Sequence, residues 1–209
     1  MFQKRGIAFI DMDTSYKNKV NQISNGARIV FLDRDGVVNK CPGDQKYVTN
    51  LSEFEFLAGV LSAIARLTKI GYSVFIISNQ AGVSKGMYSS DDLKDIDDYL
   101  LKMVKDAGGN ICGIYYCIHQ DKDECLCRKP KPGLIFKAVR ENEIDQAALK
   151  RSFFIGDSIR DVLTARQAGI KSILVFSGKE KFNSKNAWEV NPDYTAKDLS
   201  SAVDLILST

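Results

Sequence analysis

The chain has 209 residues and a net charge of +3, and 44% of its residues are hydrophobic while 26% are charged. This composition is that of a globular protein, and it excludes collagen, a wholly disordered chain and a coiled coil. The length favours one domain with a sizeable core. The small net charge gives no reason to expect a nucleic-acid partner.

The apolar stretches are too short for a membrane span or a secretory signal. A transmembrane helix needs about 20 consecutive apolar residues, and a secretory signal needs about 7 to 15. The apolar run after the basic N-terminus covers only residues 7–10 and stops at Asp11. We therefore expect a cytoplasmic protein without membrane contacts.

Short apolar runs that end at polar residues alternate with helical patterns. The predicted strands are rich in β-branched or aromatic residues and cover 29–33, 73–77, 113–117, 152–155 and 172–175. The predicted helices cover 59–70, 89–107, 133–142, 161–168 and 196–207. Ser89 and Asp92 have the spacing of a capping box at the start of the second helix. The alternation predicts an α/β protein, a Rossmann-like three-layer α/β/α domain with a mostly parallel sheet.

The first 28 residues do not fit this pattern, because residues 17–26 are polar and rich in turn formers. We interpret residues 1–28 as an N-terminal extension, either an edge strand or a linker, and residues 29–209 as the domain. No long insertion lies between Asn39 and Leu57 or between Gln80 and Ser89. The sequence therefore predicts an open crevice without a cap domain.

Three predicted strands run directly into polar side chains, which meet at the carboxyl edge of a parallel sheet. These side chains follow in the segments 33–35, 78–80 and 156–158, and the basic pair Arg128-Lys129 completes the set. Such a set suits phosphoryl transfer from a phosphate monoester to a carboxylate, because Mg²⁺ and a lysine can neutralise the charge of both anions. Asp33, Asp157 and the carbonyl of Asp35 offer the oxygen ligands that Mg²⁺ prefers.

Four segments of the sequence resemble the motifs of a known family. The segments 31–39, 77–80, 128–130 and 156–161 look like the four motifs of the haloacid dehalogenase-like phosphatases, in the same order. The resemblance implies that Asp33 is the nucleophile that becomes an aspartyl phosphate. It implies that Asp35 is the general acid and base, and that Lys129 neutralises the phosphate.

The same resemblance assigns the groups around the nucleophile. Ser78 and Asn79 would hold the phosphate, with Ser78 in place of the more common threonine. Asp33, Asp35 and Asp157 would hold the catalytic Mg²⁺. Asp161 would be a partner of the water molecules on the metal.

A cluster of cysteines precedes the basic pair. Cys117, His119, Cys125 and Cys127 form two close pairs across a five-residue loop, and His119 is the only histidine of the chain. Three thiolates and one imidazole are the ligand set of a closed structural Zn²⁺ site. The alternative is buried free cysteines beside an unrelated histidine. Because protein ligands would fill all four positions of the Zn²⁺, we expect it to leave the chemistry to other groups. The basic pair follows directly after Cys127, so the expected task of the Zn²⁺ is to position this loop.

A zinc loop before Arg-Lys-Pro resembles the family of D,D-heptose 1,7-bisphosphate 7-phosphatases and histidinol-phosphate phosphatases, and the resemblance covers residues 29–180. Residues 54–60, 80–86, 113–117 and 128–133 look more like the heptose type. The short zinc loop is like the histidinol-phosphate type, and Ile118 and Gln120 stand where proline and histidine are usual. The resemblance implies Mg²⁺-dependent removal of the 7-phosphate of D-glycero-D-manno-heptose 1,7-bisphosphate, in the biosynthesis of nucleotide-activated heptose.

Lys85 and Arg128 are candidates for binding the distal phosphate, because cationic side chains pair with phosphate oxygens. A solvated surface lysine is the alternative for Lys85. Two other functions stay open, a histidinol-phosphate phosphatase and a catalytically silent, zinc-stabilised binding module. We expect a small-molecule sugar phosphate as the partner and a monomer as the oligomeric state, with a dimer left open.

Overall fold

Six parallel strands form the centre of the computed structural model, in the order β3-β2-β1-β4-β5-β6. The structure describes residues 26–44, 46–183 and 188–208. The strands are β1 (Arg28–Leu32), β2 (Tyr72–Asn79), β3 (Gly113–Cys117), β4 (Phe153–Gly156), β5 (Lys171–Val175) and β6 (Tyr194–Ala196). β1 therefore lies in the interior of the sheet, hydrogen-bonded to β2 on one side and to β4 on the other.

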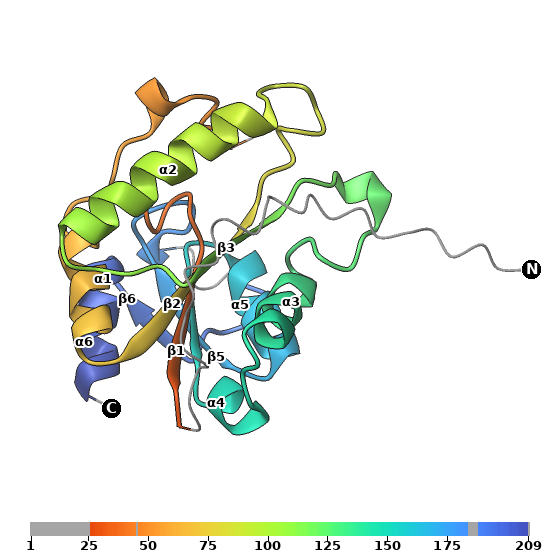
Figure 1. Cartoon of the computed structure of the whole chain (residues 1–209). Helices are drawn as coiled ribbons and strands as arrows, with labels where there is room; N and C mark the ends of the chain where they lie inside the picture. The colour runs from red at the N-terminus through yellow and green to blue at the C-terminus, as the bar shows by residue number, and fades with distance from the viewer. Residues whose placement is uncertain (1–25, 45, 184–187, 209) are drawn as a thin grey trace, which may run out of the picture.

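Helices cover both faces of the sheet (Figure 1). One face carries α1 (Val60–Lys69), α2 (Ser90–Asp106) and α6 (Leu199–Ser208). The other face carries α3 (Gly133–Glu141), α4 (Gln146–Lys150) and α5 (Ile159–Ala168). In the described residues, the short 3-10 helices η2 (Leu51–Glu53) and η3 (Asp121–Asp123) lie in loops. The three-layer fold predicted from the sequence is thus confirmed.

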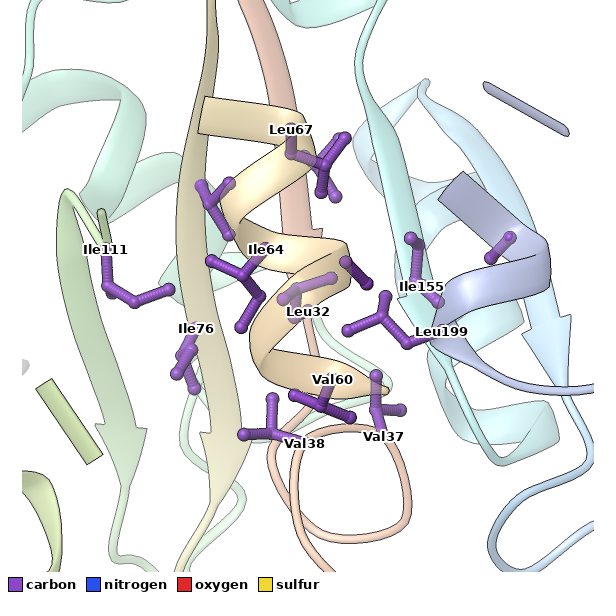
Figure 2. Close-up of a cluster of buried hydrophobic side chains, with 14 of the residues drawn as sticks. Leu32, Val37, Val38, Val60, Ile64, Leu67, Ile76, Ile111, Ile155 and Leu199 are labelled. Carbon is purple, nitrogen blue, oxygen red and sulfur yellow. The ribbon is translucent and has the colours of Figure 1, made fainter. Parts of the chain in front are cut away.

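The side chains of β1 alternate between two buried cores, as a strand that is covered on both faces requires. Val30 and Leu32 pack with residues of α1 and α6, whereas Ile29 and Phe31 pack with residues of α3, α4 and α5. Figure 2 shows Leu32 beside Ile64 of α1 in the first core. Each fully buried aliphatic side chain of this kind contributes about 1.5–3 kcal/mol, so the central strand is firmly anchored at the position from which the site extends.

The predicted strands and helices are present with their ends shifted by up to three residues, and the capping box of α2 at Ser89 and Asp92 is formed. β6 and α4 were not predicted. Most of the predicted N-terminal extension lies outside the described residues, and the predicted boundary falls at the first residues of β1.

The segments that could have carried a cap domain are short loops. In the described part of residues 33–59 only η2 is helical, and residues 80–89 contain neither a helix nor a strand. No helix in the described residues is long and apolar enough to cross a membrane.

Candidate active site

The adjacent strands β2, β1 and β4 deliver the polar side chains to one edge of the sheet. Asp33 follows β1, Ser78 and Asn79 end β2, and Asp157 follows β4. Because β1 pairs with both β2 and β4, Asp33 lies in the middle of this set. Parallel strands all present their carboxyl ends at the same edge, which is where such sheets bind ligands.

Two glycines allow the loops to approach Asp157 closely. Gly36 has a φ of +88°, and a Cβ atom there would lie 2.0 Å from Asp157 Oδ2. At Gly178 a Cβ atom would lie 1.9 Å from the same oxygen. That oxygen accepts a hydrogen bond of 2.7 Å from the backbone N–H of Lys179. The loops after β1 and β5 can therefore enclose the carboxylate only because these positions have no side chain.

Lys129 is buried between two carboxylates, with an exposed fraction of 3%. Its Nζ lies 2.9 Å from Asp33 Oδ1 and 2.7 Å from Asp161 Oδ1. Burial acts to lower its pKa, but Asp161 and Asp33 outweigh burial and raise the pKa above its usual value. Lys129 is therefore a fixed positive charge beside the predicted nucleophile.

Asp161 belongs to the capping box of α5. Its Oδ2 accepts hydrogen bonds from the backbone N–H of Ser158 at 3.1 Å and from the Ser158 hydroxyl at 2.6 Å. Its other oxygen faces Lys129. The cap thus fixes the carboxylate that holds Lys129 against Asp33.

The buried acidic cluster has the chemistry of a divalent-cation site. Oxygen atoms of Asp33, Asp157 and Asp161 lie within 4.8 Å of one another. Burial, opposed by Lys129, raises the pKa of Asp33 to about 6. Burial and the neighbouring Asp33 raise the pKa of Asp157 well above its usual range. Three carboxylates against one lysine leave excess negative charge, and hard oxygen donors of this kind fit Mg²⁺.

Asp35 is oriented by its neighbours. Its Oδ1 accepts a hydrogen bond of 3.0 Å from Arg34 Nη2 and one of 2.9 Å from Asn39 Nδ2. Arg34 is fully buried and its guanidinium lies over the Tyr116 ring, 5.7 Å from the centroid. The predicted acid and base is thus held by the two buried donors Arg34 and Asn39.

A cavity of about 150 Å³ joins these groups, and its lining includes two cationic residues that were not predicted from the sequence, Arg160 and Lys179. Arg160 lies inside the fourth motif segment, so its position was a usable signal. Lys179 follows β5, where no motif marks it. The predicted residues that line the cavity are Asp33, Asp35, Ser78, Asn79, Lys129, Asp157 and Asp161.

The two predicted distal-phosphate residues do not line that cavity. Arg128 Nε pairs with Asp121 Oδ1 at 2.5 Å, and Arg128 Nη1 donates to the carbonyl of His119 at 3.2 Å. Lys85 Nζ donates to the Tyr47 hydroxyl at 3.0 Å. The pKa of Asp121 is lowered chiefly by Arg128, with smaller contributions from Arg160 and Lys85. These cations therefore gather around the zinc loop, beside the cavity.

The predicted zinc ligands converge. His119 Nδ1 lies 3.2 Å from Cys127 Sγ and 3.7 Å from Cys117 Sγ, and Cys125 Sγ lies 3.3 Å from Cys127 Sγ. Tetrahedral Zn²⁺ with bonds of about 2.3 Å to sulfur places ligand atoms about 3.8 Å apart. The separations of 3.2–3.7 Å are close to this value, so three thiolates and one imidazole suit Zn²⁺ and would fill all four of its positions.

The comparisons with known proteins agree with this geometry. The HAD-hydrolase-like family model matches residues 126–202. The D-glycero-beta-D-manno-heptose-1,7-bisphosphate 7-phosphatase of Helicobacter pylori strain J99 is 34% identical over 180 residues, which are 86% of this chain and 97% of that protein. The chain belongs to this phosphatase family, within the haloacid dehalogenase-like phosphatases.

Other members of the family support the assignment. The enzyme of the same name from Photorhabdus laumondii is 37% identical over 75% of this chain and 85% of its own. The crystal structure of the D,D-heptose 1,7-bisphosphate phosphatase from B. bronchiseptica, complexed with magnesium and phosphate, has a TM-score of 0.78 and 33% identity, covering 87% of this chain and 98% of that one. The family predicted from the sequence is confirmed.

Proposed function

We propose that this protein is a Mg²⁺-dependent phosphatase that removes the 7-phosphate of D-glycero-β-D-manno-heptose 1,7-bisphosphate, on the route to nucleotide-activated heptose. The names of relatives that align with most of the chain support this substrate and its β anomer. The observation that carries the chemistry is Lys129 fixed between Asp33 and Asp161 in the lining of the cavity. That arrangement suits an anionic nucleophile and an anionic substrate.

In the first step Asp33 attacks the phosphorus atom. Its Oδ1 accepts a hydrogen bond of 2.7 Å from the backbone N–H of Arg34 and faces Lys129. Its Oδ2 has no hydrogen bond within the described residues, so we assign the attack to this oxygen. As the bond from Asp33 to phosphorus forms, the bond from phosphorus to the sugar oxygen breaks, and Asp35 gives its proton to that oxygen.

In the second step water attacks the phosphorus of the aspartyl phosphate. Asp35, now ionised, takes the proton of this water, and the carboxylate of Asp33 is released together with inorganic phosphate. Lys129 stabilises the negative charge on the phosphoryl oxygens in both steps, while Ser78 and Asn79 hold the group in line. Mg²⁺ held by Asp33, Asp157 and the carbonyl of Asp35 would neutralise further charge on the same oxygens.

The second phosphate of a bisphosphate needs cations outside this centre. Arg160 and Lys179 line the cavity, and Arg128 and Lys85 lie around the zinc loop. Lys179 pairs with Asp44 at 3.2 Å. Within the described residues, Arg160 has no carboxylate within ion-pair distance. We therefore place the 1-phosphate toward Arg160 and the zinc loop.

The proposal is tested by kcat/KM for phosphate release with Mg²⁺ from both anomers of the heptose bisphosphate, histidinol phosphate and fructose 1,6-bisphosphate. We expect the β anomer to exceed histidinol phosphate by at least about a hundredfold. A preference for histidinol phosphate would assign the other branch of the family. Failure to hydrolyse any of the four would favour a silent binding module. Light scattering of the same sample tests the expected monomer.

A further inference from the structure

Asp35 is contacted by a buried glutamine from the next strand end. Gln80 has no exposed surface. Its Nε2 donates a hydrogen bond of 2.9 Å to Asp35 Oδ2 and one of 3.3 Å to Ser78 Oγ. Oδ1 of Asp35 is already occupied by Arg34 and Asn39, whereas Oδ2 has only one further contact, from Arg34 Nη2 at 3.3 Å. Gln80 therefore makes the shortest hydrogen bond to Asp35 Oδ2.

A tyrosine decides which way the Gln80 amide points. The hydroxyl of Tyr88, which is 7% exposed, donates to Gln80 Oε1. An amide whose oxygen accepts from one side must present its N–H groups to the other side. The Tyr88 hydroxyl thus keeps Nε2 directed at Asp35.

The position of Tyr88 depends on its own surroundings. A Cβ atom at Gly82 would lie 2.2 Å from the Tyr88 ring and 3.0 Å from the Tyr47 ring, so only glycine leaves room for both rings. The two rings pack with centroids 6.0 Å apart, and the Tyr47 hydroxyl accepts from Lys85. A continuous contact path therefore leads from Lys85 and Tyr47 through Tyr88 and Gln80 to Asp35.

We propose that Tyr88 and Gln80 are positioning residues that orient the Asp35 carboxylate for proton transfer to the leaving sugar oxygen. The inference rests on the proposed function, because it requires Asp35 to act as the general acid. Oδ2 is then the atom that transfers the proton. Loss of the Tyr88 hydroxyl frees the Gln80 amide to rotate, and the carboxylate loses its alignment with the substrate oxygen.

General acid assistance matters only for a poor leaving group. A sugar alkoxide must be protonated as it departs, whereas 4-nitrophenolate departs readily without a proton. A defect in the orientation of Asp35 therefore lowers kcat/KM for the sugar phosphate and leaves kcat/KM for 4-nitrophenyl phosphate nearly unchanged. This ratio reports the steps up to departure of the leaving group, before Asp35 takes the proton of the attacking water. A general loss of fold or of phosphate binding lowers both alike.

The test compares Tyr88→Phe with the wild type on both substrates. For the heptose bisphosphate we expect kcat to fall by about tenfold while KM stays within about twofold of the wild-type value. The loss in kcat is a part of the roughly 10²–10⁴-fold rate enhancement that general acid catalysis supplies. For 4-nitrophenyl phosphate we expect kcat/KM within about threefold of the wild type. Gln80→Met, which keeps the length of the side chain without its hydrogen bonds, should show the same selectivity with a larger loss.

Tyr115→Phe is the matched control. Tyr115 is a partly buried tyrosine whose hydroxyl accepts from Asn142 Nδ2 at 2.8 Å, and it does not line the cavity. It should keep wild-type kinetics at a similar cost in thermal stability. Equal losses of Tyr88→Phe on both substrates, or no loss on either, would overturn the inference.

Asp35→Asn distinguishes a failure of the proposed mechanism from a failure of the positioning role alone. If it keeps full turnover of the bisphosphate, the proposed mechanism itself fails. If it loses turnover while Tyr88→Phe and Gln80→Met keep theirs, Asp35 is the acid and only the positioning role is wrong.

Discussion

Asn79 and Lys129 are joined by two hydrogen bonds of opposite direction. Asn79 Nδ2 donates to the carbonyl of Lys129 at 3.1 Å, and the backbone N–H of Lys129 donates to Asn79 Oδ1 at 3.0 Å. The two residues are 50 positions apart in the sequence. The end of β2 thus fixes the backbone from which the Lys129 side chain extends.

Asn79→Ala should therefore damage catalysis beyond its own contact with phosphate. Without the amide, the Lys129 backbone loses both partners, and its ammonium group is less well placed for charge that develops in the transition state. We expect kcat to fall by about 10²-fold, measured by steady-state phosphate release. Asn142→Ala is the control, since that amide bonds the Ala138 carbonyl and Tyr115 away from the cavity. Wild-type kcat in Asn79→Ala would contradict the role of this clamp.

Mg²⁺ binding should weaken as the pH falls. Burial raises the pKa of Asp33 to about 6 and that of Asp157 well above its usual range in the metal-free protein. Asp33 therefore gains protons as the pH drops from 8 toward 6, and the raised pKa of Asp157 acts in the same direction. Mg²⁺ must displace these protons to bind. Titration calorimetry in two buffers of different ionisation enthalpy should show proton release on Mg²⁺ binding. An affinity that is the same at pH 6 and pH 8 would contradict this account.

Removal of Zn²⁺ should lower thermal stability and weaken substrate binding. Zn²⁺ held by the four ligands would join the end of β3 to the loop that carries Arg128 and Lys129. Binding free energy at a closed site adds to folding free energy. We expect one Zn²⁺ per chain by metal analysis, and Cys125→Ser should lower Tm by about 10 °C or more. Cys112→Ser, which alters a buried thiol outside the cluster, should retain Zn²⁺. Freshly purified protein without Zn²⁺ would refute the site.

Asp97 should make the protein less stable at high pH. It is 3% exposed and accepts a hydrogen bond of 2.6 Å from the Tyr116 hydroxyl. Burial raises its pKa from 3.8 to about 7. Below about pH 4 such a carboxyl is protonated in both the folded and the unfolded chain and does not change the free energy of unfolding. As the pH rises through 7 the raised pKa lowers the free energy of unfolding progressively, up to a limit of ~4 kcal/mol.

Asp97→Asn removes that pH-dependent cost. The Tm of the variant minus that of the wild type should therefore rise between pH 5 and pH 8, as measured by calorimetry. Asp98→Asn, which alters an exposed carboxylate paired with Lys94 on the same helix, should show a nearly constant difference. A constant difference for Asp97→Asn as well would mean that this carboxyl ionises without penalty.

Much of the site follows from the sequence because it depends on strand order. Asp33, Asn79 and Asp157 each come directly after or at the end of an apolar strand, and parallel strands bring such ends together. The zinc ligands follow from their close spacing. Neither inference requires knowledge of how a loop folds.

The parts that were missed depend on loop geometry and on weak local patterns. Arg160 faces the cavity while Arg128 turns to Asp121, and only the folded loop decides between these two cations. The contact of Tyr88 with Gln80 depends on the loop bend at Gly82. β6 consists of only three residues, all half-buried, and α4 consists of only five residues. Both are too short to give a clear period in the sequence.

The proposed activity is defined by the phosphate that is removed and by the group that attacks it. Incubation of D-glycero-β-D-manno-heptose 1,7-bisphosphate with the protein and Mg²⁺ can be followed by ³¹P NMR, with Asp33→Asn beside the wild type. The account predicts that the 7-phosphate signal disappears, that the 1-phosphate signal remains, and that inorganic phosphate appears only with the wild type. Release of the 1-phosphate, or equal turnover by Asp33→Asn, would contradict it.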